Sequence, residues 1–192
     1  MVALGFTAFC LNAQDAQTII NNALKSLGAS DLKTLEYSGS GYSFSFGQSP
    51  NPNMPWPKFN AKKYTKGINY ELGASTQVLV RTQAENPPRG GGMQPVIGEQ
   101  TQNQVIDSTS PWTGRAQILI TPYGFLKAAL TNKATVNTAK AGGKKFNVVS
   151  FTAENKYKFN GYLNEQGEVE KVETWVDNAV LGDVPVEINY SE

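Results

Sequence analysis

KYKFNGYLNEQGEVEKVETWV, residues 156–176, is the stretch that decides the fold. Its two halves have the composition of β-strands, and Asn164–Gly167 between them has that of a tight hairpin turn. Strands joined by such a turn run antiparallel to each other. The stretch therefore predicts an antiparallel sheet in the C-terminal part of the chain.

The segments on either side continue this pattern. TVNTAKAGGKKFNVVSF, residues 135–151, turns at Gly142–Gly143 and predicts a second hairpin. VPVEINY, residues 184–190, alternates apolar and polar residues, as a half-buried strand does. Its apolar side is formed by Val184, Val186, Ile188 and Tyr190.

Strand patterns also fill the first half of the chain. In YSGSGYSFSFGQ, residues 37–48, aromatic residues alternate with serine and glycine, which again predicts a half-buried strand. The next segment, SPNPNMPWPKF, contains four prolines, which cannot donate to a central ladder, so we expect an extended loop or a crossing at the sheet edge. Further strands are expected at Phe59–Tyr70, Ser75–Ala84 and Gln100–Asp107.

Two helices complete the predicted fold. Asp15 can cap a helix that continues to Leu27, and Thr121 with Pro122 begins a second helix that continues to Leu130. Two helices and about eight strands in hairpin order predict an α+β fold. We expect one curved antiparallel β-sheet with both helices on one face. By analogy, this shape is similar to that of periplasmic lipoprotein carriers.

The start of the chain, MVALGFTAFCLNAQ, is uncharged and mostly apolar. It is typical of the apolar part of a secretory signal that ends at Ala13, although the usual positive n-region is missing. The alternative is a buried strand or helix end. We expect residues 1–13 to be a truncated signal peptide and residues 14–192 to be a single α+β domain, exported to the periplasm or secreted. Cys10, the only cysteine, would leave with the signal.

Charge and composition exclude several classes of function. Seventeen basic and sixteen acidic residues give a net charge of +1, whereas nucleic-acid binders carry a strong basic excess. The apolar start, about ten residues, is too short for a transmembrane segment. The chain has no histidine, which excludes Ser-His-Asp and Cys-His catalysis and removes the commonest zinc ligand. We therefore expect no cofactor in this chain, and we expect that it is not an enzyme.

A glycine-rich stretch, ENPPRGGGMQP at residues 85–95, could suggest a phosphate loop. A phosphate loop needs G-x-x-x-x-G-K-[ST] between a strand and a helix, and here a strand pattern follows instead. We expect an exposed connection between two strands that serves as an interface or an anion contact. The residues concerned are Arg89, Gly90, Gly91, Gly92 and Met93.

Two other groups of residues could carry a function. Glu168 and Glu170 would point the same way along a strand and could share a cation or support acid/base chemistry, but such residues more commonly form the wet face of a sheet. The aromatic residues of the first half could line an apolar ligand cavity or could be plain core. The candidates for such a cavity are Tyr42, Phe44, Phe46 and Trp56.

Four long strings resemble a known group of proteins. They are WPKFNAKKYTKGINYELGASTQVLVRTQAENPPRGGGMQPVIGEQ, TPYGFLKAAL, GGKKFNVVSFTAENKYKFNGYLN and VEKVETWVDNAVLGDVPVEINYS. In this order they resemble the N-terminal, non-catalytic region of exported bacterial metallo-β-lactamase-fold (MBL-fold) metallo-hydrolases. The resemblance covers about Asn22 to the end of the chain.

In that group, the region precedes a catalytic domain that binds two zinc ions through an H-x-H-x-D-H motif. This chain has no such motif, so the resemblance implies no catalytic residue here. Tyr123 stands where relatives often have histidine, which argues against a metal role for that helix start. The resemblance implies an accessory domain that packs on a downstream zinc hydrolase domain. The alternative is a stand-alone periplasmic module that binds a lipid or another apolar ligand.

Overall fold

The computed structural model describes residues 10–85, 94–178 and 182–191, with side chains from Ala16 onward. It confirms an α+β fold with antiparallel strands. The strands form two sheets, of four and five strands, rather than the one sheet expected. The chain divides into two compact units, and the expected single α+β domain after a signal peptide stays a prediction. The helical unit contains the residues up to Leu32 and those from Ser110 onward, and the sheet unit is Lys33–Thr109.

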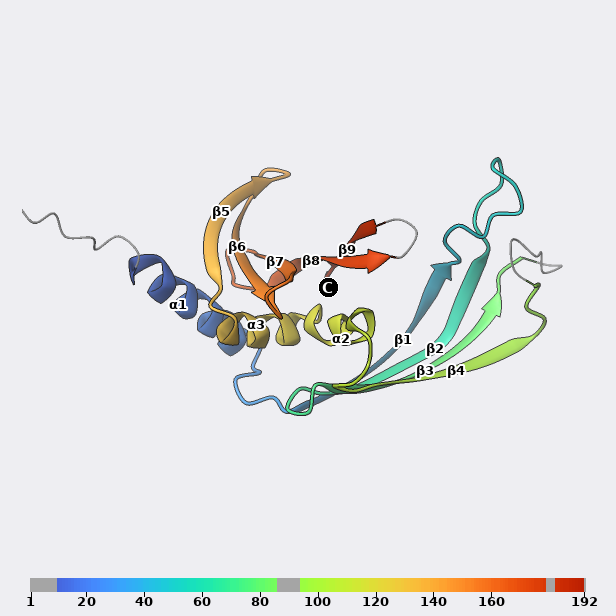
Figure 1. The fold of residues 1–192 in the computed structure, drawn as a ribbon, viewed down its shortest axis with the longest axis horizontal. Helices are drawn as coiled ribbons and strands as arrows, with labels where there is room; N and C mark the ends of the chain where they lie inside the picture. Colours follow the sequence, from blue (N-terminus) through green and yellow to red (C-terminus); the bar gives the residue numbers. More distant parts are fainter. Residues whose placement is uncertain (1–9, 86–93, 179–181, 192) are drawn as a thin grey trace, which may run out of the picture. The chain divides into compact units, whose positions relative to one another are not determined.

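The helical unit combines three helices with the five-stranded sheet (Figure 1). Its strands pair in sequence order, each antiparallel to the next, as the hairpin patterns predicted. Its elements are α1 (Cys10–Ser26), α2 (Trp112–Leu119), α3 (Pro122–Thr131), β5 (Thr135–Ala141), β6 (Lys144–Ala153), β7 (Tyr157–Leu163), β8 (Val169–Asn178) and β9 (Gly182–Asn189).

The core of the helical unit lies between α3 and the inner face of its sheet. Phe125 and Leu126 of α3 are fully buried, as are Phe159, Val149 and Val172 of the strands. These are large apolar side chains, so their burial contributes to the hydrophobic free energy that stabilises the unit. On β9 the predicted alternation is present, but its apolar positions are only half-buried.

The helices agree only partly with the sequence pattern. The N-cap of α3 is as predicted: the Gly124 N–H donates to the Thr121 hydroxyl over 3.3 Å. Helix α1 begins at Cys10 rather than Asp15, so residues 10–13 of the expected signal peptide are helical. Helix α2 was missed. Among the described residues, no helix is both long and apolar enough to cross a bilayer.

The sheet unit contains the four-stranded sheet, also in sequence order. Its strands are β1 (Thr34–Phe44), β2 (Lys58–Asn69), β3 (Ala74–Gln83) and β4 (Glu99–Ile106). Between the pairs Gly39–Tyr64 and Gly41–Ala61, β1 advances by two residues and β2 by three. The extra residue is a β-bulge in β2, and the alternation of side chains along β1 is uninterrupted.

Candidate functional site: an aromatic surface and an apolar hollow

Four large aromatic side chains of the sheet unit are exposed. The exposed fractions are 64% for Tyr42, 50% for Phe44, 65% for Phe46 and 42% for Trp56. The prediction that this strand is half-buried is therefore wrong here, and the four side chains do not belong to the core. They are the four residues that we proposed for a ligand cavity, and we call them the aromatic surface.

The backbone brings the four side chains together in two pairs. Tyr42 and Phe44 are two residues apart on β1, so they share one face, with ring centroids 5.7 Å apart. The Ser45 N–H donates to the Pro57 carbonyl over 2.9 Å, which closes the loop that follows β1. This closure places Phe46 against Trp56 in an edge-to-face contact, with centroids 4.6 Å apart.

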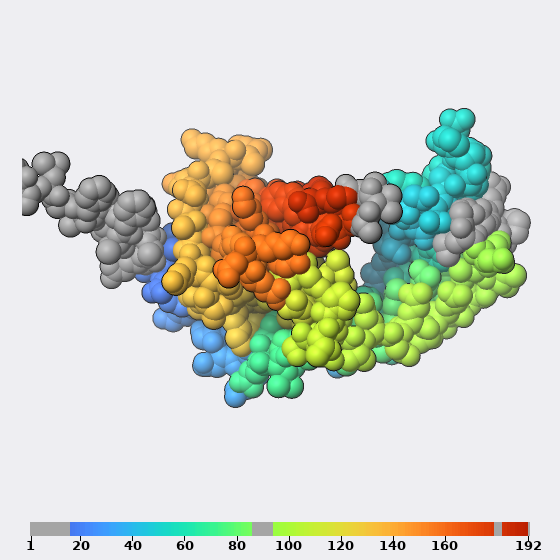
Figure 2. Space-filling model, in the orientation of Figure 1, coloured from blue at the N-terminus to red at the C-terminus, as the bar shows by residue number. Residues whose placement is uncertain are grey.

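The loop between Ser45 and Pro57 is held by its own hydrogen bonds. The Ser49 hydroxyl contacts the Met54 carbonyl over 2.6 Å, and the Asn53 N–H donates to the Asn51 side chain over 3.0 Å. Four prolines restrict its backbone further. Figure 2 shows the loop region, in cyan, projecting beyond the strands of the sheet unit. Strand β1 therefore presents Tyr42 and Phe44 of the aromatic surface, and a preorganised loop presents Phe46 and Trp56.

A cationic side chain, Lys58, lies beside the aromatic surface. The Lys58 ammonium sits 4.2 Å from the centroid of the Tyr42 ring, which is a favourable cation–π geometry. On the same strand, Lys62 pairs with Glu99 over 3.2 Å. The Lys58 N–H donates to the Glu85 carboxylate over 2.9 Å, which fixes the start of β2 to the end of the following hairpin.

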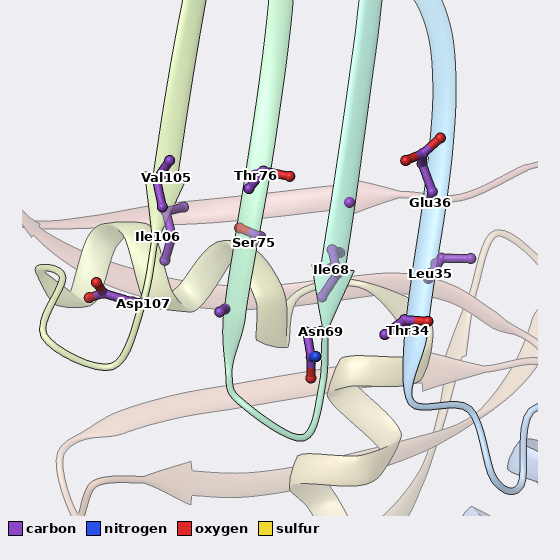
Figure 3. Close-up of a pocket in the computed structure, with 12 residues that line it drawn as sticks. Thr34, Leu35, Glu36, Ile68, Asn69, Ser75, Thr76, Val105, Ile106 and Asp107 are labelled. Atoms are coloured by element: carbon purple, nitrogen blue, oxygen red, sulfur yellow. The ribbon is translucent and has the colours of Figure 1, made fainter.

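The same face of the sheet carries a shallow hollow at the other end of the strands (Figure 3). Glu36, Gly67, Thr76 and Val105 are successive cross-strand partners and so share this face. Gly67 and the neighbouring Ala74 have too little side chain to fill the space above them. The result is a hollow of about 390 Å³, with Val105 71% exposed at its rim.

The aromatic surface and the hollow are separate sites. Glu36 lines the hollow and Tyr42 is six residues further along β1, which at about 3.3 Å per residue is roughly 20 Å. None of the four aromatic side chains lines the hollow. One small ligand therefore cannot contact both the aromatic surface and this hollow.

The glycine-rich interface residues Arg89, Gly90, Gly91, Gly92 and Met93 lie outside the described residues. The stretch connects β3 to β4, which pair with each other, so it joins two neighbouring strands as expected. Both of its ends are anchored: Glu85 accepts from Lys58, and the Val96 N–H donates to the Gln83 side chain over 2.9 Å.

The acidic residues of β8 are engaged with neighbouring side chains. Glu170 pairs with Lys144 over 3.1 Å, and it also accepts from Asn164, as does Glu168. The hydrogen bond from Lys144 is the main cause that lowers the pKa of the Glu170 carboxyl. In the part of the chain that the structure describes, no group of three or more His, Cys, Asp or Glu side chains lies close enough together to hold a metal ion. These contacts fit the interpretation that Glu168 and Glu170 lie on the solvent-exposed face of the sheet better than a cation site or an acid/base site.

The sequence did not reveal the apolar hollow. Its residues come from four strands, and only the register between strands shows that Gly67 and Ala74 share a face with Val105. A polar hollow of the helical unit, lined by residues from Asn132 to Asn160, was missed for the same reason.

No model of a known protein family matches the chain, and no curated protein matches its sequence.

Proposed function

We propose that the chain is a non-catalytic accessory region of an exported MBL-fold metallo-hydrolase, and that its aromatic surface docks on the zinc-binding catalytic domain. The exposure of Tyr42, Phe44, Phe46 and Trp56 carries this proposal. The identity of the partner rests on the resemblance of the four strings in the sequence.

The size of the aromatic surface suits part of an interface. Aromatic side chains offer about 150–250 Å² each, so the exposed fractions of these four amount to roughly 450 Å². A standard protein interface takes about 800 Å² from each partner. The largest exposed apolar patch of a typical monomer measures about 300–600 Å² and is often functional, so an aromatic surface of this size is compatible with an interaction site.

The rigidity of the loop favours the same function. Docking a flexible loop costs conformational entropy for every residue that becomes ordered. Here the Ser45–Pro57 closure and the internal hydrogen bonds of the loop restrict the backbone before a partner arrives. Tryptophan and tyrosine are also the residue types that dominate binding energy at interfaces.

The coding sequence beyond Glu192 tests the identity of the partner. We expect the reading frame to continue into a segment with the H-x-H-x-D-H motif. A stop codon directly after Glu192, with no hydrolase gene beside it, would contradict the proposal.

Calorimetry of the longer hydrolase tests the docking. Phe46→Ser and Trp56→Ser should loosen the contact and separate the melting transitions of the accessory and catalytic parts. Leu72→Ser is the matched control, because Leu72 is 69% exposed but lies in the turn between β2 and β3. If all three variants melt like the wild type, the aromatic surface does not dock. Sedimentation with anionic phospholipid vesicles that is lost in Phe46→Ser would assign the surface to a membrane instead.

A second candidate function is the binding of a lipid or another apolar ligand. The observation that favours it is the hollow beside Val105, whose 390 Å³ lies within the usual range for ligand sites, about 300–1,000 Å³. Native mass spectrometry of the purified chain should then show a bound apolar molecule. Val105→Asp should abolish that binding while Phe44→Asp should not, because Val105 lines the hollow and Phe44 does not. Loss with Phe44→Asp alone would contradict this assignment.

A further inference from the structure

The outer face of the five-stranded sheet carries a polar hollow of about 530 Å³. It lies where β5 begins, β6 ends and β7 begins, next to the end of α3 (Figure 1). Thr135, Ser150 and Asn160 are successive cross-strand partners, and Thr152 pairs with Lys158. The lining is completed by Asn132, Lys133, Phe151 and Asn155.

Two lysines without ion pairs give this hollow a positive charge. Among the described residues, neither Lys133 nor Lys158 has a carboxylate within salt-bridge distance. The other lining residues include no carboxylate. The two nearest acidic residues along the strands are already paired: Glu154 binds Arg115, and Glu173 binds Lys171 over 2.5 Å. The charge of the two lysines is therefore not neutralised by these groups.

The neutral side chains of the hollow are arranged to offer both donors and acceptors. The Ser150 hydroxyl donates to the side-chain amide oxygen of Asn160 over 2.8 Å, so the Asn160 NH₂ group is the part left to donate. Asn132 is oriented in the opposite sense, because its NH₂ group donates to the Ala128 carbonyl over 2.8 Å. Its side-chain oxygen is then the group left to accept. Sugar hydroxyls need both kinds of partner.

Lys133 occupies a backbone position that glycine would favour. Its φ is 51°, in the left-handed region, directly after α3. The Ala134 N–H donates to the Ala129 carbonyl over 3.2 Å, which is the long hydrogen bond of a Schellman helix end. A lysine there is strained relative to glycine. The position thus holds an ammonium group beside the hollow at the expense of local stability, as is common at functional sites.

We propose that this hollow binds a sugar that carries an anionic group, a phosphate or a carboxylate. The ammonium groups of Lys133 and Lys158 bind the anion, and the amides of Asn132, Asn155 and Asn160 bind the hydroxyls. This site lies in the helical unit and is independent of the aromatic surface, so the failure of either proposal leaves the other intact.

Isothermal titration calorimetry tests the site with four probes: glucose 6-phosphate, glucuronate, glucose and inorganic phosphate. We expect glucose 6-phosphate or glucuronate to bind at least ten times more tightly than glucose or phosphate alone. The stronger of the two anionic sugars identifies the anion. Equal affinity for inorganic phosphate, or no binding of either anionic sugar, would overturn the proposal.

Two variants separate binding from folding. Lys133→Gly removes a charge and relieves the left-handed strain, so it should weaken binding about tenfold while raising Tm by about 2–4 °C. Lys158→Ala should also weaken binding about tenfold. Lys140→Ala, an exposed lysine of β5 outside the hollow, is the control and should change neither quantity. Wild-type affinity in both Lys133→Gly and Lys158→Ala would contradict the site.

Discussion

The ring of Phe125 occupies the space where a side chain of residue 161 would lie. A Cβ atom added to Gly161 would come within 2.2 Å of Cε1 of Phe125, far inside van der Waals contact. Phe125 is on α3 and Gly161 is on β7, so this contact sets how closely the helix packs on the sheet. The helical unit depends on a glycine for packing space rather than for backbone freedom.

Gly161→Ala should therefore destabilise the helical unit. Overpacking of a dense core typically costs about 1–3 kcal/mol, and the fully buried Phe125 has little room to move. Urea unfolding followed by circular dichroism measures the loss. Gly39→Ala is the matched control: Gly39 also lies in a strand, but no atom lies within 4 Å of its added Cβ. Equal effects of the two substitutions would contradict the packing argument.

Thr121→Ala should cost about 1 kcal/mol of unfolding free energy. The Thr121 hydroxyl accepts from the Gly124 N–H at the start of α3 and donates to the Ile118 carbonyl over 2.7 Å. Alanine leaves both buried backbone groups without this partner. Thr121→Ser keeps the hydroxyl and should recover most of the loss in the same urea titration. A serine variant as unstable as the alanine variant would show that the methyl group, not the cap, matters.

The stability of the helical unit should fall in acid. Lys144 and Asn164 lower the pKa of Glu170, and Asn189 and Lys171 lower the pKa of Glu187. A lowered carboxyl pKa in the folded state contributes stability above the unfolded value near 4.5, and this contribution is lost as the pH falls through the folded value. Unfolding measured at about pH 7 and about pH 3 should show the loss.

Lys144→Met tests the cause of this acid sensitivity. Without the ammonium group the pKa of Glu170 should return toward its ordinary value, so the variant should lose less stability than the wild type between the same two pH values. Lys140→Met, at an exposed position outside the ion pairs, should behave like the wild type. An unchanged pH dependence in Lys144→Met would mean that the ion pair does not form in solution.

The aromatic surface should contribute little to the stability of the chain. Phe46→Ser should change the unfolding free energy by no more than about 1.5 kcal/mol, because 65% of its surface is exposed and the main loss is the ring contact with Trp56. Phe59→Ser is the matched comparison in the same unit, since Phe59 is only 1% exposed, and it should cost at least about 3 kcal/mol. A large loss in Phe46→Ser would show that the residue is core and would remove the basis for a docking surface.

Local sequence signals predicted the local structure well. The Thr121–Pro122 start of α3 and the hairpin turns at Gly142–Gly143 and Asn164–Gly167 are all present. Each depends on a few neighbouring residues whose capping or turn chemistry is specific. Helix α2 was missed for two reasons. Its N-cap residue, Pro111, makes no side-chain cap hydrogen bond, and Gly114 within the helix has a low helix propensity.

Properties that depend on distant residues were predicted poorly. Alternation in residues 37–48 showed that Tyr42 and Phe44 share a face, but not whether anything covers that face. The division into two sheets depends on which strands pair, which the hairpin patterns do not determine between β4 and β5. The two hollows depend on cross-strand register in the same way.

The central claim is that the aromatic surface is covered in the longer hydrolase, and thiol labelling measures this directly. Phe46→Cys, in a Cys10→Ala background, leaves one cysteine in this region. Its rate of alkylation should fall at least tenfold when the catalytic domain is present, while the rate of the Leu72→Cys control should not change. Equal alkylation of Phe46→Cys with and without the catalytic domain would contradict the account.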